Sequence, residues 1–242
     1  MVAAAKNIVV LTGAGISAES GVPTFRDAQT GFWARYRPED MASQAGYRAN
    51  PAMVWRWYEH RREMVARVKP NAGHVALAVF EKRHAAGQFT LVTQNVDGLH
   101  QRAGSTDVLC LHGDLNTQRW LDAPKDCCRL DEAVAGDPPR CGRCGNLLRP
   151  AVVWFGEALA SRVLDRAQQA AEGCDLMLVV GTAGAVYPAA GLARLASRAR
   201  ASVLIVNPAQ SELDDAADLI VRSPASVALP RILGTGETRI AA

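Results

Sequence analysis

The segment 13–27 constrains the fold of this chain more than any other part of the sequence. It follows directly on the apolar run at residues 7–12 and reads Gly-Ala-Gly before it continues in small and polar residues. A buried strand that ends in Gly-x-Gly is typical of Rossmann-type domains, whose backbone N–H groups face the pyrophosphate of a nucleotide. Pro23 stands where a dehydrogenase would continue its helix, and proline interrupts a helix interior. The segment therefore predicts a nucleotide site that does not serve hydride transfer.

Apolar, β-branched runs recur along the chain and alternate with helical patterns. They predict buried parallel strands at residues 8–11, 89–92, 108–111, 176–180, 203–206 and 219–221. Helical periodicity covers residues 51–68, 73–86, 158–171 and 188–198. This alternation predicts an α/β fold with a Rossmann-type, doubly wound parallel sheet, whose ligands bind beyond the carboxyl ends of the strands.

Two segments interrupt the alternation and predict insertions into a single domain spanning residues 1–242. We expect a small helical insertion at about 27–70 and a cysteine-rich, zinc-binding insertion at about 114–151. The Rossmann core would then comprise about 5–26, 71–113 and 152–230. The second insertion has no strong periodicity, so a metal or a loop framework must order it.

Composition excludes several classes of function. The chain has 242 residues, 49% of them hydrophobic, which suffices for a full core. Its net charge of +3 is too small to indicate nucleic-acid binding. No apolar run approaches the roughly 18 residues of a membrane span, and the first strand begins too early to leave room for a signal peptide. We therefore expect a cytoplasmic protein without nucleic-acid or membrane partners. The sequence leaves the oligomeric state open, and the absence of a long heptad pattern favours a monomer.

Three sequence blocks, in this order, resemble the signature of the sirtuins, the NAD-dependent protein-lysine deacylases. The blocks are the segment 13–27, Thr-Gln-Asn-Val-Asp-Gly-Leu-His at 93–100, and Leu-His-Gly at 111–113. The resemblance extends from about residue 7 to about 225. It implies an enzyme that uses NAD as co-substrate, acts on acylated-lysine proteins or peptides, and releases nicotinamide and O-acyl-ADP-ribose. The alternatives are a plain deacetylase, a protein ADP-ribosyltransferase, or a non-catalytic NAD-sensing module.

Candidate catalytic residues follow two of the predicted strands. His112 comes directly after the strand at 108–111, and a neutral imidazole is a competent base at neutral pH. Asn95 and Asp97 follow the strand at 89–92, where turn chemistry is the ordinary interpretation. The resemblance makes His112 the general base and places Asn95 and Asp97 in the nicotinamide and ribose pocket. It implies the following cofactor-binding residues: Gly13, Ala14, Gly15, Glu19, Phe25, Arg26, Gln94, Asn95, Asp97, Gly181, Thr182, Asn207 and Ala225.

Tyr58 and Arg61 lie three residues apart and therefore share one helix face. Such a pair is usually part of a solvated stripe. Together with Ala42, however, it resembles the sirtuin subgroup that removes acidic acyl groups, in which the small residue widens the acyl pocket and the Tyr–Arg pair binds a distal carboxylate. The resemblance thus implies a preference for succinyl-, malonyl- or glutaryl-lysine. It also implies that the substrate peptide pairs with the segment Val152, Val153, Trp154, Phe155 and Gly156.

The zinc site departs from the family pattern. Cys141 and Cys144 have the two-residue spacing of a tetrahedral zinc site. The family supplies a second such pair soon after the catalytic histidine, but Trp120 stands where its first cysteine would fall. Cys127 and Cys128 follow later as adjacent residues. A structural four-cysteine zinc site is the leading interpretation, and a lost or three-cysteine site is the alternative.

Overall fold

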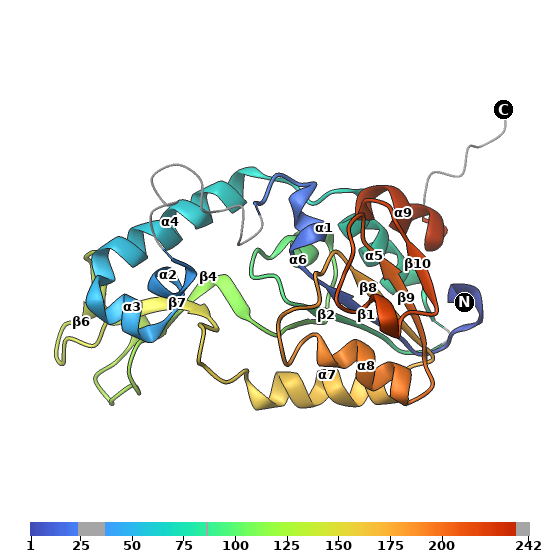
Figure 1. The fold of residues 1–242 in the computed structure, drawn as a ribbon. Coiled ribbons are helices and arrows are strands. Elements are labelled where there is room, and N and C mark those ends of the chain that lie inside the picture. The colour runs from blue at the N-terminus through green and yellow to red at the C-terminus, as the bar shows by residue number, and fades with distance from the viewer. Residues whose placement is uncertain (24–36, 86, 236–242) are drawn as a thin grey trace.

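The core of the computed structural model is a six-stranded parallel sheet in the order β10-β9-β8-β1-β2-β3 (Figure 1). The structure describes residues 1–23, 37–85 and 87–235. The strand bounds are β1 Ile8–Thr12, β2 Phe89–Thr93, β3 Val108–Cys110, β8 Leu176–Val180, β9 Ser202–Val206 and β10 Leu219–Val221. All six strands are within one residue of the expected limits at both ends. The predicted doubly wound α/β fold is confirmed.

Helices cover both faces of this sheet because its strands bury side chains on both sides. Val9 and Leu11 of β1 pack in one cluster with α7 (Ser161–Gly173) and α8 (Gly191–Arg198). Ile8 and Val10 alternate with them and pack against α5 (Ala72–Arg83) and α9 (Ala225–Ile232). Two five-residue helices, α1 (Ala14–Ala18) and α6 (Leu99–Ala103), follow β1 and β2. Short 3-10 turns lie at Val2–Ala4, Leu130–Glu132 and Asp214–Ala216.

A second lobe, which we call the small lobe, comprises residues 37–68 and 113–157. It contains the antiparallel pair β4 (Gly113–Trp120) and β7 (Leu148–Val152), and the helices α2 (Pro38–Met41), α3 (Gln44–Ala49) and α4 (Pro51–Arg67) (Figure 1). A two-stranded ribbon, β5 (Ala133–Val134) and β6 (Arg140–Cys141), lies at its far end. These elements share a core cluster that includes Tyr47, Trp57 and Trp154.

The long helix α4 is fixed at both ends by side chains. Asn50 caps its start by accepting a hydrogen bond from the Met53 backbone N–H at 3.3 Å, and Pro51 occupies the first turn. At its end the Arg102 guanidinium donates a 2.8 Å hydrogen bond to the Val65 carbonyl. Arg102 belongs to α6, so the end of α4 is bonded to the short helix that follows β2 of the parallel sheet.

Strand β4 was not expected from the sequence. Half of its residues are exposed, and its pairing with β7 shifts in register between Asp114 and Gln118. Irregular pairing of polar residues leaves no alternating pattern to detect. Helix α9 was also not expected, and α7 and α8 begin three residues later than predicted. Among the described helices, none is long and apolar enough to cross a membrane.

Candidate functional site

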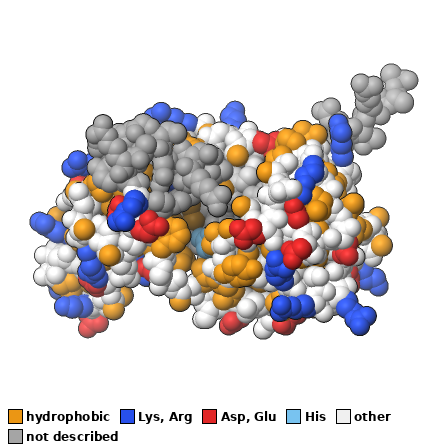
Figure 2. Space-filling model, viewed as in Figure 1, with side chains coloured by type: hydrophobic (Ala, Val, Ile, Leu, Met, Phe, Trp, Pro, Cys, Tyr) orange, Lys and Arg blue, Asp and Glu red, His pale blue; other side chains and the backbone are white. Residues whose placement is uncertain are grey.

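A cavity of about 650 Å³ lies between the carboxyl edge of the parallel sheet and the small lobe. Figure 2 shows a hollow there, bordered by hydrophobic side chains and with histidine surface visible inside it. The sheet reverses its strand order between β1 and β8, and open α/β sheets bind ligands at such a point. The cavity wall includes these predicted site residues: Ala14, Ala42, Tyr58, Arg61, Gln94, Asn95, Asp97, His112, Val152, Val153, Trp154, Phe155 and Gly156.

The loops after β1, β8 and β9 meet beside this cavity. Gly15 donates its backbone N–H to the Gly181 carbonyl at 2.7 Å, and a Cβ added to Gly15 would lie 2.7 Å from the Gly181 Cα. Glycine is therefore required for the two loops to approach. Thr182 accepts a hydrogen bond from the Gln94 amide at 3.1 Å, and its carbonyl accepts one from Asn207 at 3.1 Å. Five predicted nucleotide-binding residues are thus joined in one small network.

Asn95 and Asp97 extend this network into the cavity. The Asn95 amide donates to the Gly13 carbonyl at 3.0 Å and to the Ser17 Oγ at 3.1 Å. Ser17 in turn donates to Asp97 Oδ2 at 2.7 Å, and the Leu99 N–H donates to Asp97 Oδ1 at 2.9 Å. Burial raises the pKa of Asp97, against the opposing effect of these hydrogen bonds. The result is a polar pocket lined by a desolvated carboxyl group.

His112 directly precedes β4 of the small lobe, and one of its ring nitrogens is already hydrogen-bonded. Its Nδ1 is 2.9 Å from the Gln94 carbonyl oxygen. Because a carbonyl can only accept, Nδ1 carries the proton and Nε2 keeps its lone pair. Burial lowers the pKa of His112, which favours the neutral ring. The side chain can therefore take up a proton through Nε2.

Tyr58 and Arg61 of α4 both reach the cavity wall, at the side formed by the small lobe. Tyr58 is 4% exposed, and the Arg61 guanidinium lies over the Trp57 ring at 4.9 Å from its centroid. Among the described residues, the buried Nη1 of Arg61 has no hydrogen-bond partner. Burial lowers the pKa of Arg61. The neighbouring Arg62 donates to the Leu115 carbonyl at 2.7 Å and does not line the cavity. Among the described residues of the cavity wall, Arg61 is the only arginine or lysine.

The segment 152–156 forms the part of the cavity wall next to Tyr58. The Val153 N–H donates to the His112 carbonyl and the Phe155 N–H to the Ala42 carbonyl, both at 2.8 Å. These bonds hold the segment beside the catalytic candidate and the predicted acyl pocket. The Trp154 side chain points inward, is 2% exposed and donates from Nε1 to the Tyr58 hydroxyl at 2.8 Å.

Two predicted cofactor residues, Glu19 and Ala225, belong neither to the cavity wall nor to the hydrogen-bond network beside it. Glu19 follows α1 and accepts a hydrogen bond from the Ser226 N–H at 3.2 Å, while Ala225 is buried at the start of α9. Their contacts are structural, joining α1 to α9, and their roles toward a nucleotide stay a prediction. Phe25 and Arg26 lie outside the described residues.

Two histidines outside the predicted site are among the most buried polar residues of the described chain. His74 and His100 are 0% and 1% exposed, with ring centroids 4.9 Å apart. Nε2 of His100 lies 2.9 Å from Thr12 Oγ1, and that of His74 lies 3.4 Å from Ser17 Oγ. Burial lowers the pKa of His74 to about 4 and that of His100 to about 3. Helical periodicity alone could not separate them from surface histidines.

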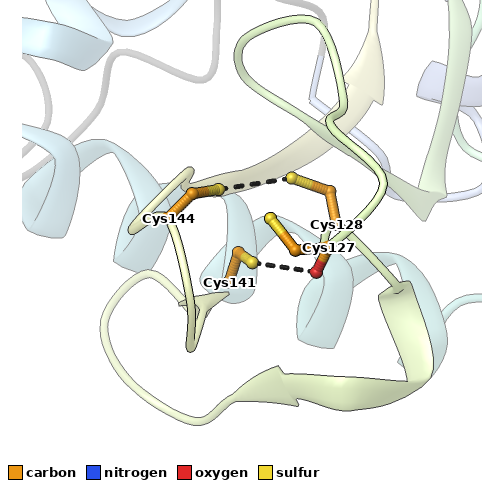
Figure 3. A group of neighbouring side chains, drawn as sticks. All are labelled: Cys127, Cys128, Cys141 and Cys144. Atoms are coloured by element: carbon orange, nitrogen blue, oxygen red, sulfur yellow. Dashed lines mark hydrogen bonds between the residues drawn. The ribbon is translucent and has the colours of Figure 1, made fainter.

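The four cysteines of the small lobe converge at its far end (Figure 3). The sulfur atoms of Cys127, Cys128, Cys141 and Cys144 all lie within 4.8 Å of one another, a spread that suits a tetrahedral zinc ion. Backbone N–H groups of residues 143 and 144 lower the pKa of Cys141 to about 7, which favours the thiolate that zinc requires. The predicted set therefore fits a structural zinc ion despite the adjacent cysteines.

Trp120 covers this cysteine cluster instead of contributing to it. Its indole N–H donates to the Cys128 carbonyl at 3.0 Å, and its ring packs in one cluster with Cys141 and Leu148. Trp120 thus helps to hold Cys128 in place beside the other cysteines.

Comparison with known proteins gives consistent matches over most of the chain. A profile of the Sir2 family matches residues 13–188. An NAD-dependent protein deacylase of Ralstonia nicotianae is 56% identical over 95% of this chain and 92% of that protein. One from Methylococcus capsulatus is 49% identical over 95% and 92%.

Solved structures agree with these sequence matches. A Sir2 homologue in complex with NAD superposes with a TM-score of 0.84 at 40% identity, covering 97% of this chain and 90% of that one. A Sir2 protein bound to acetylated peptide gives a TM-score of 0.83 at 30% identity, covering 97% and 95%.

Proposed function

The chain belongs to the Sir2 family and is an NAD-dependent protein deacylase, and we propose that it prefers lysines that carry succinyl, malonyl or glutaryl groups. The observation behind the proposal is the half-buried Arg61, whose buried Nη1 lacks a hydrogen-bond partner among the described residues. A buried cation without a partner is costly, so such a site is suited to an anionic ligand. Tyr58 lines the same cavity, and its hydroxyl would supply a second donor.

A distal carboxylate on the acyl chain would satisfy both donors. Each hydrogen bond to a charged group contributes about 1.5–3 kcal/mol, and a planar guanidinium matches a carboxylate well. Acetyl-lysine has no distal carboxylate and would leave Arg61 unpaired. Ala42 adds to the proposal because its small side chain leaves room in the cavity wall for a longer acyl chain.

The catalytic roles follow from the positions of the polar groups. NAD supplies the ribose carbon that receives the acyl oxygen, and nicotinamide is its leaving group. Asn95 and Asp97 would hold the nicotinamide end, where a carboxylate stabilises positive charge developing at the ribose. His112 would accept a proton from a ribose hydroxyl at Nε2 while Nδ1 stays bonded to the Gln94 carbonyl. The ribose hydroxyl would then bond to the acyl carbon, and a water molecule would add to that carbon and break its bond to the lysine nitrogen. The products would be lysine, nicotinamide and O-acyl-ADP-ribose.

A comparison of kcat/KM for one peptide carrying either succinyl- or acetyl-lysine tests the proposal. We expect higher values for the succinyl peptide, and Arg61→Met should remove most of that advantage. Arg56→Met is the matched control, because Arg56 lies on the same helix but is exposed and pairs with Asp137 at 3.0 Å. A wild-type enzyme that prefers the acetyl peptide would contradict the proposal and leave a plain deacetylase.

A further inference from the structure

We propose that Trp154 determines acyl specificity by orienting the Tyr58 hydroxyl, so that the phenolic proton points at the carboxylate of the acyl chain. The inference rests on the proposed function, because it assigns that orientation to the same acyl pocket. Trp154 is a positioning residue in this view, acting on the acyl group only through Tyr58.

One hydrogen bond joins the side chains of Trp154 and Tyr58. Trp154 Nε1 donates to the Tyr58 oxygen at 2.8 Å, and both side chains are almost completely buried. Among the described residues, Trp154 is the only hydrogen-bond partner that we find for this hydroxyl. An indole N–H can only donate, whereas a phenol both donates and accepts. The bond therefore occupies the accepting side of Tyr58 and leaves its proton to be donated elsewhere.

The direction of the indole ring is itself fixed. The Arg149 guanidinium carbon lies 3.3 Å from the centroid of the Trp154 ring, and the Tyr47 ring lies 5.1 Å away. Arg149 is fully buried and pairs with both carboxylate oxygens of Glu157. Glu157 also accepts the Trp154 backbone N–H at 3.0 Å. Contacts with Arg149 and Tyr47 thus hold the indole ring in the orientation in which Nε1 faces Tyr58.

Two further features agree with a donating phenol. Burial raises the pKa of Tyr58 to about 12, so the hydroxyl keeps its proton at physiological pH. Arg61 lies one helical turn away and lines the same cavity. A carboxylate between them would accept one bond from the phenol and one from the guanidinium. Because Trp154 also belongs to the segment 152–156, the residue links the wall beside the peptide to the end of the acyl pocket.

A double-mutant cycle isolates the effect that passes through the hydroxyl. The enzymes are the wild type, Trp154→Phe, Tyr58→Phe and the double variant, and the quantity is the ratio of kcat/KM for succinyl and acetyl peptides. We expect Trp154→Phe to lower this ratio about tenfold, the value of one hydrogen bond. In the Tyr58→Phe background the same change should leave the ratio within about twofold, since coupled residues are not additive. Equal effects in both backgrounds would overturn the inference.

Trp55→Phe provides the control for loss of a buried indole. Trp55 belongs to the same helix α4 and is 4% exposed, but it does not line the cavity. Its substitution should leave the succinyl-to-acetyl ratio unchanged even if it lowers stability. If Trp55→Phe lowered the ratio as much as Trp154→Phe does, the ratio would depend on packing within the small lobe and not on the bond to Tyr58.

A second readout does not depend on acyl preference. In protein labelled with ¹⁵N-tryptophan, the indole N–H signal missing from Trp154→Phe identifies Trp154. We expect this signal to move upfield and exchange faster with solvent in Tyr58→Phe, because its acceptor is lost. An unmoved signal overturns the inference whatever the acyl preference. A moved signal in an enzyme that prefers acetyl peptide would retain the bond but overturn the proposed function and the specificity role together.

Discussion

Ser17 donates a 2.7 Å hydrogen bond to Asp97 and so ties the helix after β1 to the loop after β2. Asp97 is only 5% exposed, and burial raises its pKa even though two donors and nearby arginines oppose the shift. The ionised carboxylate is therefore held at a cost in the folded protein. Perturbed groups of this kind concentrate at functional sites.

Replacing Asp97 by Asn should stabilise the protein while it inactivates the enzyme. A carboxyl group whose folded pKa is raised stabilises the fold below its unfolded pKa, and that contribution is lost as the pH rises through the folded pKa. At pH 7 the charge is thus unfavourable, and removing it should raise Tm by about 2–4 °C for each kcal/mol gained. Turnover should fall at least about 100-fold if Asp97 stabilises developing charge. Thermal unfolding and steady-state assays measure the two effects.

Asp107→Asn is the control for this experiment. Asp107 is exposed and pairs with Arg166 at 2.6 Å, and surface pairs of this kind contribute about 0–1 kcal/mol. Its substitution should leave both Tm and turnover close to the wild type. A lower Tm for Asp97→Asn would mean that its hydrogen bonds outweigh the cost of desolvation.

The pH dependence of kcat/KM should report His112. Burial lowers its pKa below the ordinary 6.5, and a base works in its deprotonated form. Activity should therefore be constant from about pH 6.5 upward and fall only at more acidic pH, with a midpoint below 6.5. His112→Tyr should abolish turnover and preserve NAD binding, measured by calorimetry. An acid limb centred above pH 6.5, or turnover that survives the substitution, would contradict the role as base.

Features of the structure that leave a local pattern in the sequence could be predicted from it. The strands of the large sheet carry continuous apolar runs, and the residues after them fall at one edge by topology, so Gln94 and His112 could be placed without coordinates. The spacing of Tyr58 and Arg61 likewise fixes a common helix face.

Other features depend on contacts between distant segments, which no local pattern encodes. The Trp154–Tyr58 bond joins residues 96 positions apart. The pairing of His74 with His100 and the irregular strand β4 are similar cases, since polar residues at helical or irregular spacing look the same whether buried or exposed. The convergence of Cys127 and Cys128 with the later pair depends on the turn that Trp120 supports.

Stability should fall steeply as the pH drops below 6.5, because His74 and His100 are buried in neutral form. Their folded pKa values of about 4 and about 3 lie below the ordinary 6.5, so the unfolded chain binds more protons between these limits. Each histidine then contributes a slope of about 1.4 kcal/mol per pH unit, stability rising with pH. Urea unfolding from pH 6.5 to 4.5 measures the slope.

His100→Gln should reduce that slope by about 1.4 kcal/mol per pH unit, and His60→Gln should not change it, because His60 is exposed on α4. A slope that stays the same in His100→Gln would assign the acid sensitivity to other groups.

Loss of zinc should destabilise the small lobe and report which cysteines bind. The purified protein should contain one zinc ion per chain, since all four sulfur atoms lie within 4.8 Å of one another. Cys141→Ser should lose the metal and lower Tm by about 5–10 °C, corresponding to a few kcal/mol. Cys110→Ser is the control, because Cys110 lies in β3 outside the cluster. If both Cys127 and Cys128 are ligands, either substitution by Ser should release zinc; full retention by one of them would establish a three-cysteine site.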